Sequence, residues 1–402
     1  MDYGHRRCGL DPLVALQGDG VAVPEHRQEK SPCPHRQDWL SGPSIEPLQL
    51  RGHEQVADMI DHVFGRSGFN ARRLAQGAQL YARMLEEGAT VCLTVAGAMT
   101  PIGMSGVFIT LMEHGFVDFI IATGANVYHD LHRPYNCPVV QGSPEVDDNV
   151  LDEDGVARIF DVFIGQDSTL AATDKVIQRV VADMRTDQPF STAALHHRIG
   201  SRVAEEAPHP EKSFVVAAAK YDVPIYTSSP GDSSIGMNLV VPHLFKAPVA
   251  LNPILDVIET TALVRDAKTN GVVEIGGGSP KNFYLQTQPT LHQILFDTTK
   301  GGHDYFLQLG IDGPQWGGLS GATPSEAKSW GKVRDAHKNN VVVYSCASLT
   351  FPLIAQYVLA RVKPRRHRRL YPRLAEIVDS LRESAKANPE LRKQYPELFP
   401  TR

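Results

Sequence analysis

The sequence predicts an α/β fold with a mostly parallel sheet and helices on both faces. From about residue 50 onward, short runs of apolar and β-branched residues alternate with helical patterns. Strands such as 117–122 are short and mostly apolar, which is typical of strands buried on both faces of a parallel sheet. Strand–helix alternation also requires crossover connections, and these place the helices on the two faces.

The local pattern predicts each element in turn. Gly115 ends the helical pattern over 102–114, and a turn at 123–125 follows the strand at 117–122. We expect strands at 91–95, 117–122, 159–164, 223–228, 272–275, 305–309 and from 341 onward. We expect helices at 102–114, 169–185, 192–206, 214–220, 253–268, 281–296 and 324–337, with two more near the C-terminus.

The pattern also divides the chain. Residues 1–45 are rich in Pro, His, Arg and Gln without periodicity, so we expect a flexible or irregular extension. One domain is expected over 46–370 and a charged helical tail over 371–402. The 20 uncharged residues over 341–360 have the length of a membrane span, but their polar residues favour a buried strand and a helix opening near Pro352.

Composition excludes several classes of protein. The chain has 402 residues, 42% of them apolar, which excludes wholesale disorder and a disulfide-stapled miniprotein. The net charge of −5 argues against nucleic acid or an anionic membrane as the main partner. The five cysteines form no C-x-x-C pair, which excludes a zinc ribbon and indicates a reducing compartment such as the cytoplasm. The N-terminus has no apolar segment, so we expect no secretory signal.

Three polar, glycine-bearing turns follow predicted strands, at 123–126, 228–234 and 276–281. Because parallel strands end at one edge of their sheet, these turns are expected to lie together. The Gly-Gly-Gly-Ser-Pro-Lys turn lets the backbone approach a ligand and precedes a helix N-terminus, which favours an anion. It matches neither the dinucleotide fingerprint nor the P-loop, so a tight strand-to-helix turn is the alternative. Together the turns suggest a ligand with hydroxyl and phosphate groups.

A fourth segment, 317–332, carries groups suited to amine chemistry. Trp330 offers a face for a cation, and Glu326, four residues earlier, can neutralise an amine on the same helix face. Lys332 beside a cationic pocket would have a lowered pKa and could act as a nucleophile. The alternative is a core tryptophan and a surface lysine.

Other polar groups give weaker signals. His129 and His132 are three apart, and His196 and His197 are adjacent, but no third ligand has a convincing spacing, so we expect no metal site. Cys346 follows a predicted strand, where a ligand could reach it, although burial as a small apolar residue is the commoner role. The basic run over 365–369 reads as a solvated helix-end cluster, with a contact to an anion or a partner chain as the alternative.

Five strings of the sequence resemble the deoxyhypusine synthase family. They are ATGANVYHD (122–130), VPIYTSSPGDSSIGMN (223–238), EIGGGSPKNFYLQTQP (274–289), GHDYF (302–306) and GGLSGATPSEAKSWGK (317–332). The resemblance covers about 50–370 and is greatest for the bacterial deoxyhypusine synthase-like branch. It implies a Rossmann-like fold, a homotetramer with NAD near the subunit boundaries, and transfer of an aminobutyl group from spermidine through an imine on a lysine, without net oxidation.

The family motifs assign roles to individual residues. Lys332 matches the lysine that forms the imine. Substrate-side positions match Glu326, Trp330, Asn282 and Ser320. Cofactor-side positions match Gly97, Ala98, Met99, Thr123, Gly124, Asp232, Gly277, Gly278, Ala347 and Ser348.

The chain differs from the eukaryotic members of the family at five positions in or near these motifs. Asn282 replaces an acid–base histidine, Met237 and Leu319 replace aspartates that grip amines, His129 replaces a glutamate, and Cys346 replaces an aspartate. Each lost charge-assisted contact is worth about 1.5–3 kcal/mol. The resemblance therefore does not imply spermidine bound in the same way.

The leading hypothesis is an NAD-dependent transferase that uses Lys332 as a covalent nucleophile. Its donor is expected to be an amine or guanidine such as putrescine, spermidine or agmatine. The acceptor is a small amine, as in a homospermidine synthase, or a protein, as in deoxyhypusine synthase itself. The absence of the acid–base histidine leaves a second hypothesis open, a non-catalytic NAD-binding protein.

Overall fold

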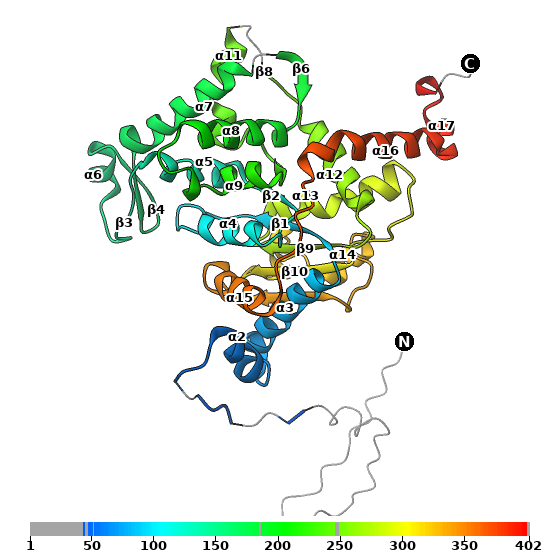
Figure 1. The fold of residues 1–402 in the computed structure, drawn as a ribbon, viewed down its shortest axis with the longest axis horizontal. Coiled ribbons are helices and arrows are strands. Elements are labelled where there is room, and N and C mark those ends of the chain that lie inside the picture. Colours follow the sequence, from blue (N-terminus) through cyan, green and yellow to red (C-terminus); the bar gives the residue numbers. More distant parts are fainter. Residues whose placement is uncertain (1–42, 45–46, 51, 185, 246–248, 400–402) are drawn as a thin grey trace, which may run out of the picture. The chain divides into compact units, whose positions relative to one another are not determined.

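A six-stranded parallel sheet lies at the centre of the fold, with strand order β11-β10-β9-β1-β2-β7 (Figure 1). The computed structural model describes residues 43–44, 47–50, 52–184, 186–245 and 249–399, so most of the predicted N-terminal extension lies outside the described residues. The strands of the sheet are β1 (Thr90–Val95), β2 (Phe119–Ala122), β7 (Ile225–Thr227), β9 (Asn270–Ile275), β10 (Tyr305–Gly310) and β11 (Asn340–Tyr344).

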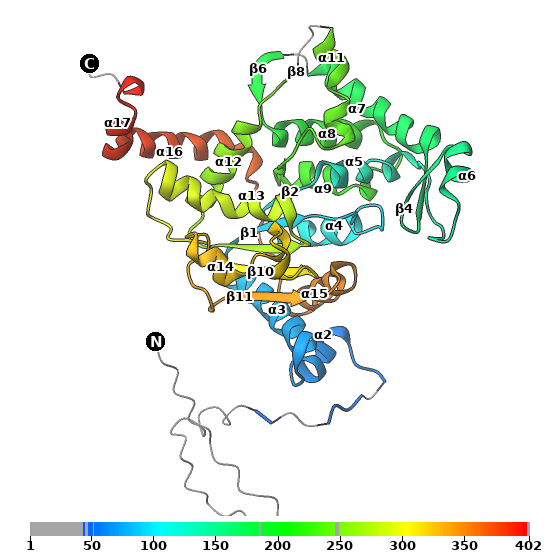
Figure 2. The same ribbon diagram turned by 180° about the vertical axis from the view of Figure 1, so that it is seen from behind.

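Helices cover both faces of this sheet, which confirms the predicted fold class. Successive strand residues point to opposite faces, so Leu93 joins one apolar cluster and Cys92 joins another. The first cluster includes side chains from α3, α4, α9 and α15, and the second includes side chains from α12, α13 and α16. In the view from behind, β11 lies at the end of the sheet that is farthest from α8 and α9 (Figure 2).

The helices have these bounds: α2 (Val56–Met59), α3 (Phe69–Glu86), α4 (Ser105–Glu113), α5 (Gly124–Asp130), α6 (Asp148–Glu153), α7 (Ala172–Asp183), α8 (Thr192–Glu206), α9 (Phe214–Tyr221), α10 (Ser234–Met237), α11 (Val240–Leu244), α12 (Pro253–Asp266), α13 (Gly278–Pro289), α14 (Pro324–Ser329), α15 (Ala347–Arg361), α16 (Leu374–Ala387) and α17 (Pro389–Gln394). The apolar side of α16 packs against α12.

The strand order reverses direction beside β1. From β1 the chain adds β2 and β7 on one side, then returns to add β9, β10 and β11 on the other. The carboxyl ends of β1 and β9 therefore flank a topological switch point, and open α/β sheets bind their ligands in the crevice outside such a point. A ligand is therefore expected at the loops that follow β1 and β9.

One predicted strand is wrong. The run over 159–164 is not a single strand of the main sheet but a hairpin of β4 (Val156–Ile159) and β5 (Val162–Gly165), with Phe160 in the turn at φ 55°. β5 also pairs with β3 (Val139–Gln141) in a separate antiparallel sheet. The apolar run conceals the turn because its left-handed residue is a phenylalanine rather than a glycine. A further small pairing joins β6 (Thr186–Phe190) to β8 (Val249–Leu251).

The predicted helix over 324–337 is also wrong, because α14 ends at Ser329. The backbone N–H of Gly331 donates to the carbonyl of Lys328 (2.9 Å), and the N–H of Lys332 donates to the carbonyl of Ala327 (2.9 Å). These two bonds, with Gly331 at φ +68°, form a Schellman motif, which reverses the chain directly before Lys332. The lysine is thus placed by a helix end.

Other element boundaries moved by a few residues. The predicted turn at 123–125 contains the start of α5, and α13 begins at Gly278 rather than at Lys281. The uncharged stretch 341–360 is divided between β11 and α15, as expected, but α15 begins at Ala347 and contains Pro352. Packing of Phe351, Ile354 and other buried side chains of α15 outweighs the missing proline N–H. Within the described part of the chain, every helix is too short or too polar to cross a membrane.

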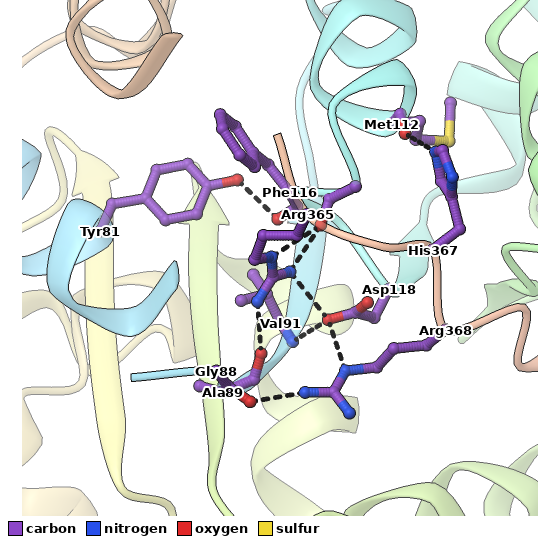
Figure 3. Close-up of polar contacts among 11 residues, drawn as sticks. Tyr81, Gly88, Ala89, Val91, Met112, Phe116, Asp118, Arg365, His367 and Arg368 are labelled. Carbon is purple, nitrogen blue, oxygen red and sulfur yellow. Dashed lines mark hydrogen bonds and ion pairs between the residues drawn. The ribbon is translucent and has the colours of Figure 1, made fainter. Parts of the chain in front are cut away.

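The interpretation of the basic run as a solvated helix-end cluster is wrong for Arg365. Its side chain is only 15% exposed and lies 3.2 Å from the carboxylate of Asp118, which is 2% exposed (Figure 3). The guanidinium also donates to the carbonyls of Ala89 (2.9 Å) and Gly115 (2.6 and 2.9 Å). The segment between α15 and α16 therefore crosses the amino ends of β1 and β2, opposite the edge with the candidate site.

Candidate active site

The loops that follow β1, β2, β7 and β9 meet at the carboxyl edge of the sheet. A Cβ atom on Gly124 would lie 2.3 Å from Oγ of Ser233, so the loop after β2 touches the loop after β7. A Cβ atom on Gly276 would lie 3.4 Å from Cβ of Ala96, so the loop after β9 lies against the loop after β1. The three polar turns of the sequence are thus brought together around the switch point.

Asn126 joins two of the predicted cofactor segments. Its side-chain oxygen accepts hydrogen bonds from the backbone N–H groups of Met99 and Thr100, each at 3.1 Å. Its amide nitrogen donates to the carbonyl of Gly97 (2.7 Å) and to Oγ1 of Thr123 (2.8 Å). Asn126 is 1% exposed, so these bonds are protected from water and fix the two loops relative to each other. The sequence showed Asn126 in a turn but not this role.

The loop after β7 lies against the start of α13. Oγ of Ser279 is 2.6 Å from Oγ of Ser228 and 3.2 Å from Oγ of Ser229. Asp232, assigned to the cofactor side by the family motif, is exposed, and its backbone N–H donates to the carbonyl of Ser229. Its carboxylate is accessible to a ligand at this edge.

The triple-glycine turn is closed by another segment of the same chain. Gly276 and Gly278 have φ angles of +74° and +57°, which favour glycine. A Cβ atom on Gly277 would lie 2.5 Å from Cα of Ser320, and Oγ of Ser320 accepts the N–H of Gly278 at 2.9 Å. Of the two interpretations of this turn, the tight strand-to-helix turn explains all three glycines. Pro280 has no N–H, which further reduces the donors available to an anion.

Lys281 is buried beneath this turn, and sequence analysis assigned it no role. It is 1% exposed, and its Nζ donates to Oε1 of Gln308 (2.8 Å) and to the carbonyls of Ala322 (2.7 Å) and Ser320 (3.2 Å). The amide nitrogen of Gln308 donates to the carbonyls of Ser320 (2.7 Å) and Gly276 (2.9 Å). These bonds hold the segment before α14 against the start of α13. The one sequence signal for this role of Lys281 is its position directly after Pro280 at the start of a helix.

The charge of Lys281 has a buried counterpart in Glu274 of β9. Glu274 is 0% exposed, and within the described residues neither of its carboxylate oxygens has a hydrogen-bond partner. Burial raises the pKa of Glu274 to about 8, and the nearby Lys281 opposes that rise. Burial also lowers the pKa of Lys281, against the attraction of Glu274. The pair lies beside the loop edge where Lys332 is found.

Lys332 projects towards the helix that follows the triple-glycine turn. Its Nζ donates to Oδ1 of Asn282 at 2.9 Å and lies 5.7 Å from the centroid of the Trp330 ring. Desolvation lowers the pKa of Lys332, the charge of Lys281 lowers it further, and Glu326 raises it. A lysine with a lowered pKa carries more of the neutral, nucleophilic amine at a given pH.

Trp330 and Glu326 border the same loop. Trp330 is 58% exposed, whereas Lys332 is half-buried, so the alternative of a core tryptophan and a surface lysine is wrong. Glu326 lies in the first turn of α14, where its backbone N–H donates to Oγ1 of Thr323. An exposed aromatic face and a carboxylate beside a half-buried amine can together receive an organic cation.

A hollow of about 350 Å³ lies beside Asn282 between α12 and α13. Its described lining is hydroxyl, amide and apolar, with no carboxylate: Val257, Thr260, Thr261, Ser279, Asn282, Phe283, Gln286, Thr287, Thr290 and Leu319. Leu319 is half exposed and Met237 is 63% exposed, so two positions that are acidic in the eukaryotic members present apolar surface here.

Other predicted residues lie farther along the edge. Ala347 and Ser348 begin α15 after β11, two strands away from the triple-glycine turn. Cys346 is exposed rather than buried, and hydrogen bonds from Ser348 lower the pKa of its thiol. His129 is bonded to His132 through Nδ1 and Nε2 (2.9 Å), and burial lowers the pKa of these histidines to about 4 and about 3. Among the described residues, no group of three or more potential metal ligands gathers.

Comparison with known proteins identifies the family. The family model described as deoxyhypusine synthase matches residues 58–358. The chain belongs to the deoxyhypusine synthase family. A deoxyhypusine synthase-like protein of Nostoc punctiforme is 40% identical over 361 residues, which are 87% of this chain and 92% of the relative. A probable deoxyhypusine synthase 2 of Methanosarcina acetivorans is 33% identical over 324 residues, which are 80% of this chain and 91% of the relative.

The solved structures agree with the fold of this family. The crystal structure of a putative deoxyhypusine synthase from Entamoeba histolytica has a TM-score of 0.51 with 15% sequence identity, and the match covers 79% of this chain and 99% of that chain. At that identity the likeness shows the fold alone. The resemblance inferred from the sequence strings is therefore confirmed at the level of family and fold.

Proposed function

We propose that the protein is an NAD-dependent transferase that moves an aminoalkyl group from a polyamine or related amine to an acceptor amine. The observation that carries this proposal is the bond between Nζ of Lys332 and Asn282, one helical turn from the triple-glycine turn. A half-buried amine bonded to α13, the helix after β9, supports covalent chemistry near the switch point of the sheet. Family membership supports amine-transfer chemistry at that position.

The residues at the switch point fit NAD as the cofactor. Gly97 and Gly276 adopt positive φ angles beside the small residue Ala96, so the crevice between β1 and β9 is not narrowed by side chains there. The exposed carboxylate of Asp232 suits a ribose hydroxyl group. We propose that Gly97–Met99, Thr123, Gly124 and Asp232 contact the cofactor. NAD, when bound, supplies the capacity to accept a hydride from the substrate carbon and to return it.

The chemistry we propose for Lys332 requires its neutral form. Oxidation of the donor amine by loss of a hydride leaves a carbon–nitrogen double bond, and the ε-amine adds to its carbon. The donor's leaving nitrogen departs as an amine with the proton, and the transferred group remains on Lys332 as an imine. Attack by the acceptor amine releases Lys332 and transfers the carbon–nitrogen double bond to the acceptor, and a hydride supplied by bound NAD would reduce that bond to give the product amine. The lowered pKa of Lys332 supports the first addition.

The surroundings of Lys332 favour small amines over a protein acceptor. Asn282 can orient the lysine through its amide oxygen but cannot act as an acid or base at neutral pH. Among the described residues, the hollow beside it presents no carboxylate for a polycation, and Glu326 is the carboxylate whose charge acts on Lys332. We therefore propose a homospermidine synthase-like reaction between small amines, with the donor drawn from putrescine, spermidine and agmatine.

The test is mass spectrometry of amine products with and without NAD. The chain should form a new amine from at least one donor–acceptor pair, and Lys332→Ala should abolish it. Lys328→Ala, which removes an exposed lysine from α14, the helix that precedes Lys332, serves as the matched control. Failure to form any product from these donors would end the proposal.

Trapping with borohydride separates this function from a non-catalytic NAD-binding protein, which the replacement of the acid–base histidine by Asn282 favours. A reduced amine adduct on Lys332 in the presence of donor and NAD supports the transferase. NAD binding without an adduct supports the binding protein. Radiolabelled spermidine entering a protein band would instead support a protein acceptor.

We also propose that copies of the chain associate as a homotetramer in the cytoplasm. Large apolar side chains are exposed in α10, α11 and the loops around α14. Such exposed apolar surface is typical of subunit contacts. Cys92, Cys137 and Cys346 are free, which suits a reducing compartment. Light scattering of the purified chain measures the subunit number. The exposed residues are Met237, Val240, Val241, Leu244, Phe245, Trp316, Leu319 and Trp330.

A further inference from the structure

A second concentration of charge lies at the amino edge of the sheet, away from Lys332. The irregular segment between α15 and α16 is fixed there by Arg365, whose backbone N–H donates to the carbonyl of His114 (2.8 Å) and whose guanidinium bonds to Ala89 and Gly115. Figure 3 shows Arg365 and Arg368 converging on Asp118. The arginines of this segment are therefore held on a bonded backbone.

The basic side chains of this segment are only partly neutralised. Asp118 is shared, at 3.2 Å from Arg365 and 3.5 Å from Arg368. Arg373 has acidic neighbours only at 3.8 Å (Asp266) and 3.9 Å (Glu376). A single buried carboxylate thus faces two guanidinium groups, which leaves a local excess of positive charge in a chain whose net charge is −5.

Arg366 adds to this excess. It is exposed, and among the described residues it has no hydrogen-bond or ion-pair partner. By contrast, Arg369, which does not line the hollow described next, is paired with Asp222 at 2.7 Å. The arginines of this segment that lack a close acidic partner are therefore those that line this hollow.

The hollow has a volume of about 420 Å³ and is lined by Gly88, Arg365, Arg366, His367, Arg368 and Arg373. Four of these six residues are arginines, and the described lining includes no acidic side chain. Arg368 is anchored by a 2.5 Å bond to the carbonyl of Gly88 and is 37% exposed, so part of its guanidinium remains accessible. The hollow has the size and the donors for a compact, multiply charged anion.

We propose that this hollow binds a small phosphate-bearing anion, either inorganic phosphate or pyrophosphate or the phosphate groups of a nucleotide. Guanidinium groups present forked N–H donors that match phosphate oxygens, and several of them around one hollow favour a multivalent anion over a single carboxylate. The site is separate from the Lys332 chemistry and does not depend on the proposed transferase.

The structural role of this segment explains Arg365 but not its neighbours. Arg365 satisfies two backbone carbonyls and Asp118, so its burial needs no ligand. Arg366 and Arg373 make no comparable bonds, although both line the hollow. Like charges that are only partly paired repel each other when they are held close together, and a bound anion relieves that repulsion. These two residues are therefore the ones to test.

The experiment is a calorimetric titration of the full chain with pyrophosphate at neutral pH and fixed ionic strength. Binding at the edge with Lys332 would not change when arginines of the hollow are replaced, so the variants below distinguish the two sites. We expect one site per chain, with affinity weakened at least about tenfold in the double variant Arg366→Ala/Arg373→Ala. Arg382→Ala/Arg392→Ala, on α16 and α17, makes the same change of charge away from the hollow and should bind as the unaltered chain does.

Parallel titrations with orthophosphate and ATP identify the source of the phosphate. Tighter binding of ATP than of pyrophosphate would indicate that the ligand is a nucleotide, and equal binding would indicate a free phosphate. Either result supports the site if the double variant Arg366→Ala/Arg373→Ala binds neither ligand as tightly as the unaltered chain does. Absence of pyrophosphate binding, or equal weakening in the two double variants, overturns the proposal. A changed subunit number in Arg366→Ala/Arg373→Ala, together with no binding to the unaltered chain, would show a subunit contact instead.

Discussion

Nζ of Lys332 donates a hydrogen bond to Oδ1 of Asn282 at 2.9 Å, across 50 residues of sequence. The bond connects the end of a six-residue helix to the start of the helix that follows the triple-glycine turn. The amide oxygen at this position accepts a hydrogen bond from lysine but cannot remove its proton at neutral pH. The lysine is therefore oriented by Asn282, while its ionisation is governed by burial and by Lys281 and Glu326.

The first prediction concerns this bond. Asn282→Ala should lower kcat for amine transfer by about tenfold, because a hydrogen bond contributes about 0.5–1.5 kcal/mol and its loss frees the lysine to move. NAD affinity should stay unchanged. Steady-state product formation and NAD titration measure the two quantities. Gln293→Ala, at an exposed position in the same region, is the control. Unaltered kcat in Asn282→Ala would show that the bond does not position Lys332.

The second prediction concerns the pH dependence of activity. Glu326 raises the pKa of Lys332, so Glu326→Gln should lower that pKa and move the rise of kcat with pH to lower pH. Saturating amine separates this effect from the weaker substrate binding that loss of a carboxylate also causes. The rate of borohydride-trapped adduct formation, followed across pH, reports the shift. A shift towards higher pH would contradict the assigned electrostatics.

The third prediction concerns the buried pair of Glu274 and Lys281. Lys281→Met should destabilise the fold by about 1–3 kcal/mol, because it removes three hydrogen bonds and the cation that opposes the rise in the pKa of buried Glu274. The double variant Lys281→Met/Glu274→Met should recover part of the loss, since it leaves no unpaired buried charge. Urea unfolding measures both variants. Equal instability of the single and double variants would show that the two charges are not coupled.

The fourth prediction concerns the helix end before Lys332. Gly331→Ala places a Cβ 2.8 Å from Nε2 of His292 at a residue with φ +68°. The left-handed conformation alone costs a non-glycine residue about 1–2 kcal/mol. We expect a matching loss of stability and a larger loss of activity, because Lys332 follows directly. Thermal unfolding and product formation measure these effects.

The matched control for this change is Gly106→Ala in α4. A Cβ there meets nothing within 4 Å, and its φ is not positive, so the change should leave stability equal or increase it by up to about 1 kcal/mol. Gly331→Ala with the stability and activity of the unaltered chain would show that the Schellman motif does not place the lysine.

Much of the fold could be predicted because its signals are local. The buried strands at 91–95 and 305–309 are mostly apolar runs, and the helix over 192–206 matches α8 residue for residue. The hairpin around Phe160 and the early end of α14 were missed. In both places the turn depends on one left-handed residue whose neighbours continue an apolar or helical pattern.

The amino-acid sequence by itself determined the alternation of strands and helices, the α/β class and the family to which Lys332 and its motif belong. Only the tertiary structure decided that Lys281 is buried, that Arg365 pairs with Asp118, and that Asn126 joins two loops. Periodicity reports what a residue does within its own helix or strand. Burial and ion pairing depend on groups contributed by distant segments, and those meet only when the sheet is assembled.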